Sequence, residues 1–160
     1  MEEMRLASAR WAQEADLPVL TGLYRLLEAE MAPLSDMWSV ADGLEEPVDQ
    51  ALARELESPD SLVFVGQIDS VPLGFLIARV EKLLPQAMGT EVGSIRFVFV
   101  DLPAREVGVG EAMRDMALAS LRERGISRFD AHVLPGHRLV KNFFEQGGFS
   151  ARSIIMHRSE

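Results

Sequence analysis

The chain has 160 residues, of which 48% are hydrophobic and 26% are charged, and its formal net charge is −9. This length and composition predict one globular domain, residues 1–160, with enough apolar side chains to form a core. The acidic balance argues against anionic partners, so we expect neither nucleic acid binding nor attachment to an anionic membrane. The absence of cysteine excludes disulfides, thiol nucleophiles and cysteine metal ligands.

The N-terminal residues 1–5 lack the basic and apolar regions of a signal peptide. The longest nearly apolar run, residues 71–78, is far too short to span a bilayer. We therefore expect a cytoplasmic protein without a membrane partner. His, Asp and Glu nowhere recur at the spacing of metal ligands, so we also predict no metal.

Apolar periodicity and turn residues divide the chain into alternating strands and helices. In chain order the sequence predicts a strand at 5–10, a helix from 16 to about 31, a loop or broken helix at 34–46, a helix at 47–57, strands at 61–68, 71–80 and 91–101, a helix from 110 to 125, a strand at 128–134, a helix at 137–146 and a last strand at 149–157. In the strand at 91–101, the side chains of Ile95, Phe97 and Phe99 are expected on one face. A mixed α/β sheet, mostly antiparallel, with helices on both faces follows from this order.

The segment from Val98 to Gly110 joins a strand end to a helix start through a Pro-containing loop with two glycines. Backbone N–H groups and the helix dipole would meet at one point there, which favours an anion and above all a phosphate. A dinucleotide fingerprint fits less well, because Met113 stands where a small residue is needed. A Walker loop is excluded because no Gly-Lys-Ser/Thr follows.

Residues 105–110 fit the pattern R/Q-x-x-G-x-G/A, which resembles the acyl-CoA-binding loop of the GNAT superfamily of N-acetyltransferases. Residues 134–149 resemble the final helix motif of that family, and the element order is similar over nearly the whole chain. The resemblance implies a GNAT-like fold and transfer of an acetyl group from acetyl-CoA to an amine. The acceptor would be a small molecule or a protein or peptide amine. Family members often dimerise, so a homodimer is compatible with it.

The same resemblance implies a set of cofactor-binding residues. In the family the loop amides hold the pyrophosphate, the preceding strand pairs with the pantetheine arm, and one freed strand N–H polarises the thioester carbonyl. Carried over residue by residue, the set is Val98, Phe99, Val100, Arg105, Glu106, Val107, Gly108, Val109, Gly110, Glu111 and His137.

Four residues depart from the family pattern, and the mildest change is His137, which stands where the family usually has an asparagine at the helix start. Phe144 stands where many members carry the tyrosine that protonates the leaving thiolate, and Tyr24 is the only tyrosine of the chain. Glu106 and Val107 replace the glycine and the basic residue that the loop often has, which makes it less cationic. An alternative is therefore a GNAT-fold module that binds acyl-CoA and barely catalyses. A third reading is a helix-terminus site for another phosphate ligand.

His132 is the candidate general base, because an imidazole with a near-neutral pKa suits proton removal from an amine. The alternative is a histidine that faces a helix or solvent. Glu91 is a further candidate for the base, but a glutamate at the start of a strand is more simply exposed, and Ser94 holds the position nearer the site. His157 is expected in solvent. His137 is interpreted as a helix cap or a cofactor contact. Trp38 and the acidic residues of 34–46 would attract and stack a cationic amine, or else form a solvated loop.

Overall fold

The computed structural model describes residues 6–160, so Arg5 and the N-terminal residues before it lie outside the described part of the chain. The strands are β1 (Ala7–Trp11), β2 (Ser61–Ile68), β3 (Val71–Lys82), β4 (Glu91–Val100) and β5 (Phe129–Ala131). The helices are α1 (Leu17–Met31), α2 (Trp38–Ala41), α3 (Val48–Glu57), α4 (Val109–Glu123) and α5 (Arg138–Gln146). Short 3-10 turns lie at Glu14–Asp16, Pro85–Ala87 and Leu102–Ala104.

The five strands form one sheet in the order β1-β2-β3-β4-β5. The first four are antiparallel neighbours, and β5 runs parallel to β4. Asp69 and Ser70 join β2 to β3 with φ angles of 48° and 70°, the left-handed geometry of a tight hairpin turn. The predicted mixed, mostly antiparallel sheet is confirmed.

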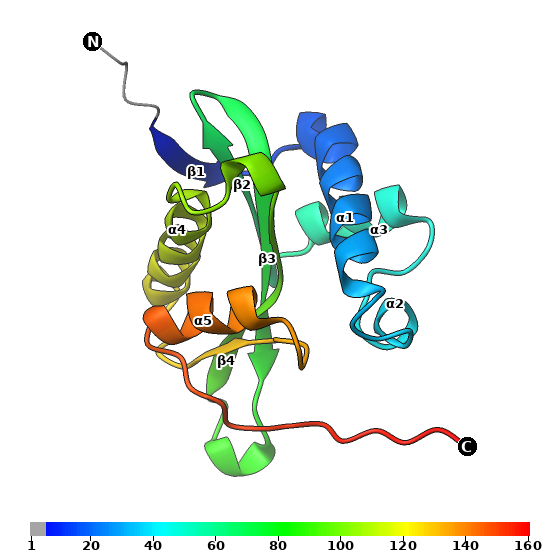
Figure 1. Ribbon diagram of the computed structural model, residues 1–160. Helices are drawn as coiled ribbons and strands as arrows, with labels where there is room; N and C mark the ends of the chain where they lie inside the picture. The colour runs from blue at the N-terminus through cyan, green and yellow to red at the C-terminus, as the bar shows by residue number, and fades with distance from the viewer. Residues whose placement is uncertain (1–5) are drawn as a thin grey trace.

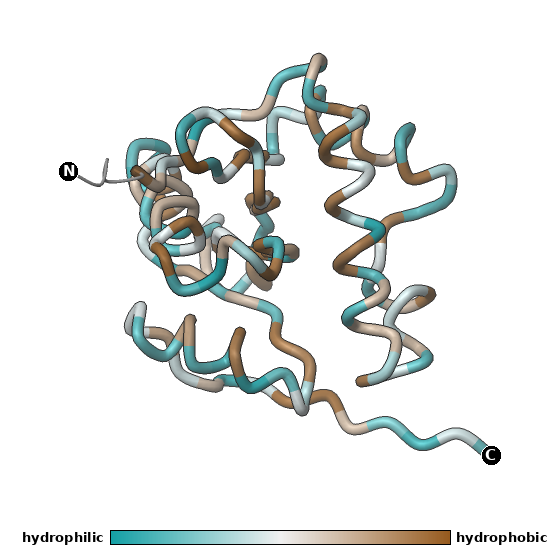
Figure 2. The backbone as a smooth tube through the Cα atoms, turned by 45° about the horizontal axis from the view of Figure 1, so that its top comes forward, coloured by the Kyte–Doolittle hydropathy of each residue, from teal (hydrophilic) through white to brown (hydrophobic). Residues whose placement is uncertain are grey.

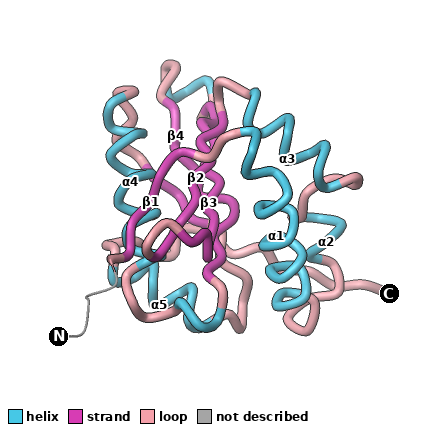
Figure 3. Tube along the Cα trace, turned by 90° about the horizontal axis from the view of Figure 1, so that it is seen from above, coloured by secondary structure: helices cyan, strands magenta, loops and turns pink. Residues whose placement is uncertain are grey.

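Helices cover both faces of this sheet, as predicted (Figures 1 and 3). One layer contains α1, α2 and α3 and packs on a buried cluster that includes Tyr24, Phe75 and Phe97. The opposite layer contains α4 and α5 and packs on a second cluster that includes Met113 and Leu121. Figure 2 shows hydrophobic residues along the sides of the helices that face the sheet. In the described residues, no helix is both long and apolar enough to cross a bilayer.

Trp38 belongs to the core, which overturns the expectation that its ring stacks an amine or lies in a solvated loop. The residue is 7% exposed, and its ring lies edge-on to Phe97 with centroids 6.2 Å apart. The segment around it is a broken helix, of which α2 is the helical part. Tyr24 fixes this segment, because its buried hydroxyl accepts a 2.7 Å hydrogen bond from the backbone N–H of Leu44. Burial raises the pKa of Tyr24, so the phenol stays protonated.

Replacing Tyr24 with phenylalanine is expected to lower the free energy of unfolding by about 1–3 kcal/mol, because the buried N–H of Leu44 would lose its partner. Urea denaturation measures the change. Thr21→Val serves as the control on the same helix, since the Thr21 hydroxyl bonds only the carbonyl oxygen of Leu17 within α1. A loss in Tyr24→Phe no larger than that of the control would contradict the assigned role.

The predicted alternation of β4 breaks at Arg96. Ile77 lies opposite Phe97 and Ala78 lies opposite Ile95, so Arg96 is one extra residue on β4, a β-bulge. The bulge reverses the faces of the strand: Ile95 packs in the α4 layer, whereas Phe97 and Phe99 pack in the α1 layer. The expectation that all three share one face is therefore wrong.

The two last predicted strands also differ from the structure. The strand at 128–134 shrinks to the three residues of β5, because β4 bends away at its bulge and offers no further partner. The strand predicted at 149–157 is absent: these residues have no regular secondary structure and pair with no strand of the described chain. Its apolar centre, residues 154–156, lacks a covering surface and is exposed to solvent.

Candidate active site

The candidate site lies where β4 and β5 part. The two strands pair only from Gly93 to Ile95 on β4, and the last bond between them runs from the N–H of His132 to the carbonyl oxygen of Ile95, 3.0 Å. The bulge at Arg96 follows immediately. Beyond it β4 continues to Val100 without pairing with β5. We name the side of β4 that is left without a strand neighbour, from His132 onward, the gap.

Free backbone groups of β4 line one side of this gap. The N–H of Asp101 donates to the carbonyl oxygen of Leu73 on the β3 side, 2.8 Å. Because strand residues alternate, Val98 and Val100 direct their N–H and C=O groups toward the opposite edge, into the gap. Their side chains pack on the α4 layer, while Phe99 is buried in the α1 layer. The candidate cofactor strand therefore offers backbone groups rather than side chains.

The start of α4 presents further unpaired N–H groups near the end of β4. Gly108 is the N-cap with φ = +98°, a conformation that favours glycine, and it has no side chain to cap the helix. The first intrahelical bond runs from the N–H of Ala112 to the carbonyl oxygen of Gly108, so the N–H groups of residues 109–111 have no partner within the helix. Val109 is buried and Glu111 is exposed. This arrangement suits an anion.

The loop before α4 has a backbone geometry at position 106 that favours glycine. Glu106 has φ = +67°, a left-handed conformation that is unfavourable for a residue with a side chain. Glu106 and Val107 both face solvent. Gly110 fits its position for another reason: a Cβ atom there would lie 3.1 Å from the Phe143 ring, a tight contact that the glycine avoids where α5 packs on α4.

Glu30 of α1 joins the loop to the start of α5, a connection that we name the Glu30 bridge. Its carboxylate lies 2.7 Å from Nη2 of Arg105 and 3.3 Å from Nε2 of His137. Arg105 also donates from Nε to the carbonyl oxygen of Val100, 2.8 Å, and so occupies one acceptor of the gap. His137 caps α5, because its Nδ1 accepts from the N–H of Val140 at 3.3 Å. Sequence reasoning missed Glu30, which lies 107 positions before His137 and in no motif.

Replacing Glu30 with glutamine is expected to tighten acetyl-CoA binding about two- to fivefold, because it removes a negative charge near the anion site and loosens Arg105 from Val100. Isothermal titration calorimetry measures the affinity. Glu28→Gln is the matched control: it removes the same charge from the same helix, where Glu28 pairs with Arg25. Equal effects of the two variants would show that the Glu30 bridge does not restrain the site.

His132 lies in a charged cluster on the α1 side of the gap. Its Nε2 is 3.0 Å from Nη1 of Arg96, and Arg96 in turn lies 3.5 Å from Glu81. Arginine can only donate, so Nε2 accepts and the proton of the neutral ring is on Nδ1. His132 is exposed, but part of its ring is shielded from water. This partial desolvation lowers the pKa of His132, and the positive charge of Arg96 lowers it further. The imidazole is therefore neutral at pH 7.

The remaining residues singled out in the sequence are spread over the molecule. Glu91 is exposed at the start of β4, and His157 is exposed near the C-terminus. Ser94 is 1% exposed, and its hydroxyl has no hydrogen-bond partner within residues 6–160. Phe144 is 3% exposed and packs between Phe143 and Phe149, with ring centroids at 5.0 and 5.2 Å. No proton donor thus stands at position 144.

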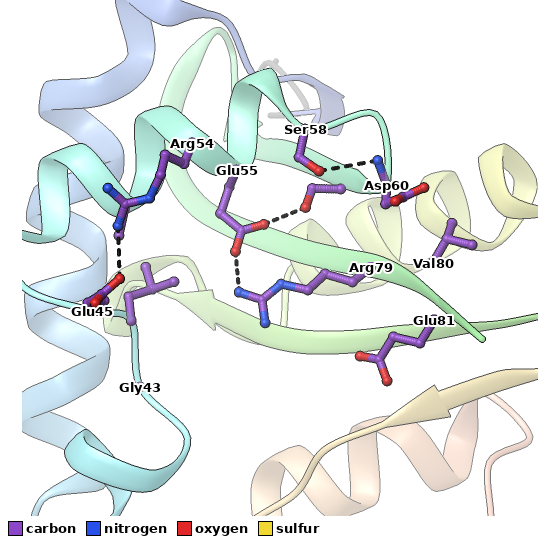
Figure 4. A pocket seen from close by; sticks show the side chains of 12 residues that line it. Gly43, Glu45, Arg54, Glu55, Ser58, Asp60, Arg79, Val80 and Glu81 are labelled. Carbon is purple, nitrogen blue, oxygen red and sulfur yellow. Dashed lines mark hydrogen bonds and ion pairs between the residues drawn. The ribbon is translucent and has the colours of Figure 1, made fainter. Parts of the chain in front are cut away.

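A pocket of about 480 Å³ opens between α3, residues 43–45 and the far end of β3 (Figure 4). Glu55 crosses its wall, accepting from the Ser61 hydroxyl at 2.5 Å and pairing with Arg79. Asp60 and Glu81 add further carboxylates to the lining. Glu81 also pairs with Arg96, so this one side chain belongs both to the lining of the pocket and to the charged cluster around His132. Within residues 6–160, no group of three or more histidines and carboxylates is arranged to hold a metal ion.

Comparison with known proteins shows which family the chain belongs to. The chain matches the family model described as "Acetyltransferase (GNAT) family" over residues 23–149. No curated protein matches the chain. Because the family match covers most of its length, it shows more than a likeness of fold.

Solved structures share the fold at low sequence identity. The aminoglycoside N-acetyltransferase AAC(6')-Iy in complex with CoA has a TM-score of 0.77 at 17% identity, covering 99% of this chain and 98% of that one. A tetramutant of the BH1408 protein from Bacillus halodurans has a TM-score of 0.81 at 15% identity, with coverages of 95% and 99%. A GCN5-related N-acetyltransferase from Ralstonia eutropha JMP134 has a TM-score of 0.76 at 20% identity, with coverages of 96% and 99%. By its family match and its fold, the chain belongs to the GNAT acetyltransferase family.

Proposed function

We propose that the chain, acting as a single domain, is an acyl-CoA-dependent N-acetyltransferase that transfers an acetyl group directly to an amine. One observation carries the proposal: the edge of β4 at Val98 and Val100, which pairs with no other strand, leads into the uncapped N-terminus of α4. A strand edge can pair with an extended amide-containing arm, and a helix N-terminus can hold a pyrophosphate. Coenzyme A has both parts.

In this proposal each backbone group has a separate task. The N–H groups of residues 108–111 bind the pyrophosphate, and the edge of β4 pairs with the pantetheine arm. The N–H of Val98 then donates to the thioester carbonyl and stabilises the negative charge that develops on its oxygen. Acetyl-CoA supplies the activated acetyl group. The hydrogen bond from Arg105 to the carbonyl oxygen of Val100 breaks when the pantetheine arm donates to that oxygen instead.

His132 serves as the general base. Its neutral ring at pH 7 can take a proton from the attacking amine once Nε2 exchanges its bond from Arg96 to the substrate. Phe144 cannot protonate the departing thiolate, so we assign that step to water. The rest of the rate would come from holding the amine next to the thioester.

The acceptor is proposed to be a small cationic amine. The pocket of Figure 4 supports this class, because Asp60 and Glu81 add negative charge to its lining, and Glu81 also pairs with Arg96, the partner of His132. Asp42 is exposed, without an ion-pair partner in the described residues, and contributes to the same electrostatic field at His132. A further structural neighbour is AAC(6')-Iy in complex with the bisubstrate analogue CoA-S-monomethyl-acetylneamine.

Two measurements test the proposal. Acetyl-CoA at 100 times its Kd is expected to stabilise the protein by about 2.7 kcal/mol, which corresponds to a rise in Tm of roughly 5–10 °C. A panel of polyamines, aminoglycosides, amino acids and peptides, scored by CoA release with a thiol reagent, should then reveal an acceptor. The chain adds no background because it has no cysteine. No thermal shift at millimolar acetyl-CoA would refute the proposal.

A second candidate function is a module that binds acyl-CoA without turnover. The buried phenyl ring at position 144 favours it, because the thiolate lacks the usual acid. This reading expects a thermal shift with acetyl-CoA and no CoA release with any amine. Steady release with one amine, above the rate of hydrolysis, would exclude it.

A further inference from the structure

A row of polar side chains crosses the α1 face of the sheet. Arg79 on β3 lies opposite Ser94 on β4, and Ser94 in turn lies opposite Asp130 on β5. The residues on either side of each member meet the α4 layer, so strand alternation turns these three side chains to the other face. We name them the polar row. Because Arg79 also lines the pocket of Figure 4, the row begins at that pocket.

The other end of the row lies beside the proposed base. Ala131 and Val133 both pack in the α4 layer, so His132 between them faces the same side as Asp130. The two residues are two positions apart on an extended segment, about 6–7 Å along the chain. Desolvation and Arg96 lower the pKa of His132, and the charge of Asp130 opposes them, so this carboxylate acts at the imidazole.

The chain's own Arg152 occupies the carboxylate of Asp130. Nε donates to Oδ1 at 2.8 Å, and Nη2 reaches Oδ2. These hydrogen bonds lower the pKa of Asp130, so the carboxylate stays charged. The carboxylate is largely buried, with 16% of the side chain exposed, whereas the side chain of Arg152 is 68% exposed. A buried carboxylate is thus covered by a guanidinium that approaches from solvent.

The segment that carries Arg152 has little else to hold it. Residues 150–160, which we name the tail, are all exposed, and Figure 1 shows them crossing below the sheet and extending away from the body. Within residues 6–160, every hydrogen bond and ion pair from the tail to the body comes from Arg152. Ion pairs with an exposed partner contribute little to stability, so another cation can displace this guanidinium.

Ser94 supplies a second sign of a ligand. Its side chain is 1% exposed, and its hydroxyl has no hydrogen-bond partner in the described chain. Its neighbours in the row are both engaged, Arg79 with Glu55 and Asp130 with Arg152. A buried hydroxyl without a partner is costly, which indicates a group that has yet to bind. A guanidinium has five N–H donors, so one ligand group can serve both the carboxylate and the hydroxyl.

We propose that Asp130 and Ser94 bind a guanidinium of the acceptor, and that Arg152 holds this place until the acceptor displaces it. The occupant in the structure indicates the chemistry of the ligand. The spacing between Asp130 and His132 sets its length: a primary amine and a guanidinium joined by an alkyl chain that spans about 6–7 Å. This inference rests on the proposed function, because it assigns specificity residues and an internal competitor to the acceptor site.

Isothermal titration calorimetry tests the competitor with agmatine, which carries a primary amine and a guanidinium at opposite ends of a short alkyl chain. The matched probe is n-pentylamine, which lacks the guanidinium. We expect Arg152→Ala to bind agmatine about fivefold more tightly than wild type and n-pentylamine equally well. Arg158→Ala is the control, because it removes the same charge from the same tail at a residue that pairs with Glu160. It should bind both probes as wild type does.

Two variants test the site itself. Asp130→Asn should bind agmatine no more tightly than n-pentylamine. Ser94→Ala should weaken agmatine binding about two- to fivefold, while its free energy of unfolding in urea does not fall, because the hydroxyl makes no hydrogen bond in the free protein. A loss of stability in Ser94→Ala without a loss of agmatine affinity would assign the hydroxyl to the fold and overturn its role in binding.

The titrations need neither acetyl-CoA nor turnover, so their failure is distinct from that of the proposed function. If Arg152→Ala bound agmatine no more tightly than n-pentylamine, Asp130 would not be a guanidinium site, even with the full thermal shift by acetyl-CoA. Equal effects of Arg152→Ala and Arg158→Ala would show that Arg152 does not compete. A missing thermal shift would refute the proposed function, and with it the acceptor role of any agmatine that binds at Asp130.

Discussion

Replacing Gly108 with aspartate is expected to abolish the thermal stabilisation by acetyl-CoA and, with it, acetyl transfer. Gly108 has φ = +98° at the N-cap of α4, and an aspartate would strain the backbone by about 1–2 kcal/mol. It would also place a carboxylate among the N–H groups that are proposed to hold the pyrophosphate, repelling one anion with another. Differential scanning fluorimetry with and without the ligand measures the loss.

The structure offers a matched control for this variant. Gly89 has φ = +84° in the turn before β4, and a Cβ atom there would meet nothing within 4 Å. Gly89→Asp therefore carries a similar backbone strain and the same added charge, away from α4. We expect it to lose a little stability and to keep the full shift with acetyl-CoA. If Gly108→Asp kept the shift as well, the anion would not bind at the N-terminus of α4.

Local patterns predicted the elements that carry the candidate site, because they depend on neighbours in sequence. Gly108 and Gly110 marked the start of α4, and the apolar periodicity of each strand from β2 to β4 placed the sheet. The bulge at Arg96 has no such signal. It depends on how β3 and β4 pair across the sheet, and residues 91–101 read from the sequence as an unbroken alternation.

Tertiary contacts explain the other gaps between sequence and structure. The Glu30 bridge joins residues from three distant elements, and nothing in α1 distinguishes Glu30 from Glu28 by pattern alone. The acidic neighbours of Trp38 predict a position near solvent, yet its ring fills a space beside Tyr24 and Phe97. The apolar run at 154–156 has the composition of a strand, yet the predicted strand is wrong, because composition does not reveal whether a neighbouring strand pairs with it, and in residues 6–160 none does.

Removing the imidazole of His132 is expected to lower kcat about 100-fold or more, the usual contribution of a general base. His132→Gln tests this with a saturating amine, and it should also erase the acidic limb of the pH profile. In wild type this limb falls below the ordinary histidine pKa of 6.5, because partial desolvation and Arg96 lower the pKa of His132. The rate therefore decreases as the pH drops through that pKa and the base becomes protonated.

Arg96→Ala separates a catalytic imidazole from a structural one. Without the guanidinium, Glu81, Asp130 and Asp42 still raise the pKa of His132, so the acidic limb of kcat/KM should move to higher pH. The rate at pH 6 should then fall more than the rate at pH 9. Arg128→Ala is the control. It removes one positive charge from an exposed residue just before β5, whereas the Nε2 atom of the imidazole pairs with Arg96. All measurements use the same acceptor amine. If the acidic limb of kcat/KM kept its position in Arg96→Ala, a group other than His132 would take the proton from the amine.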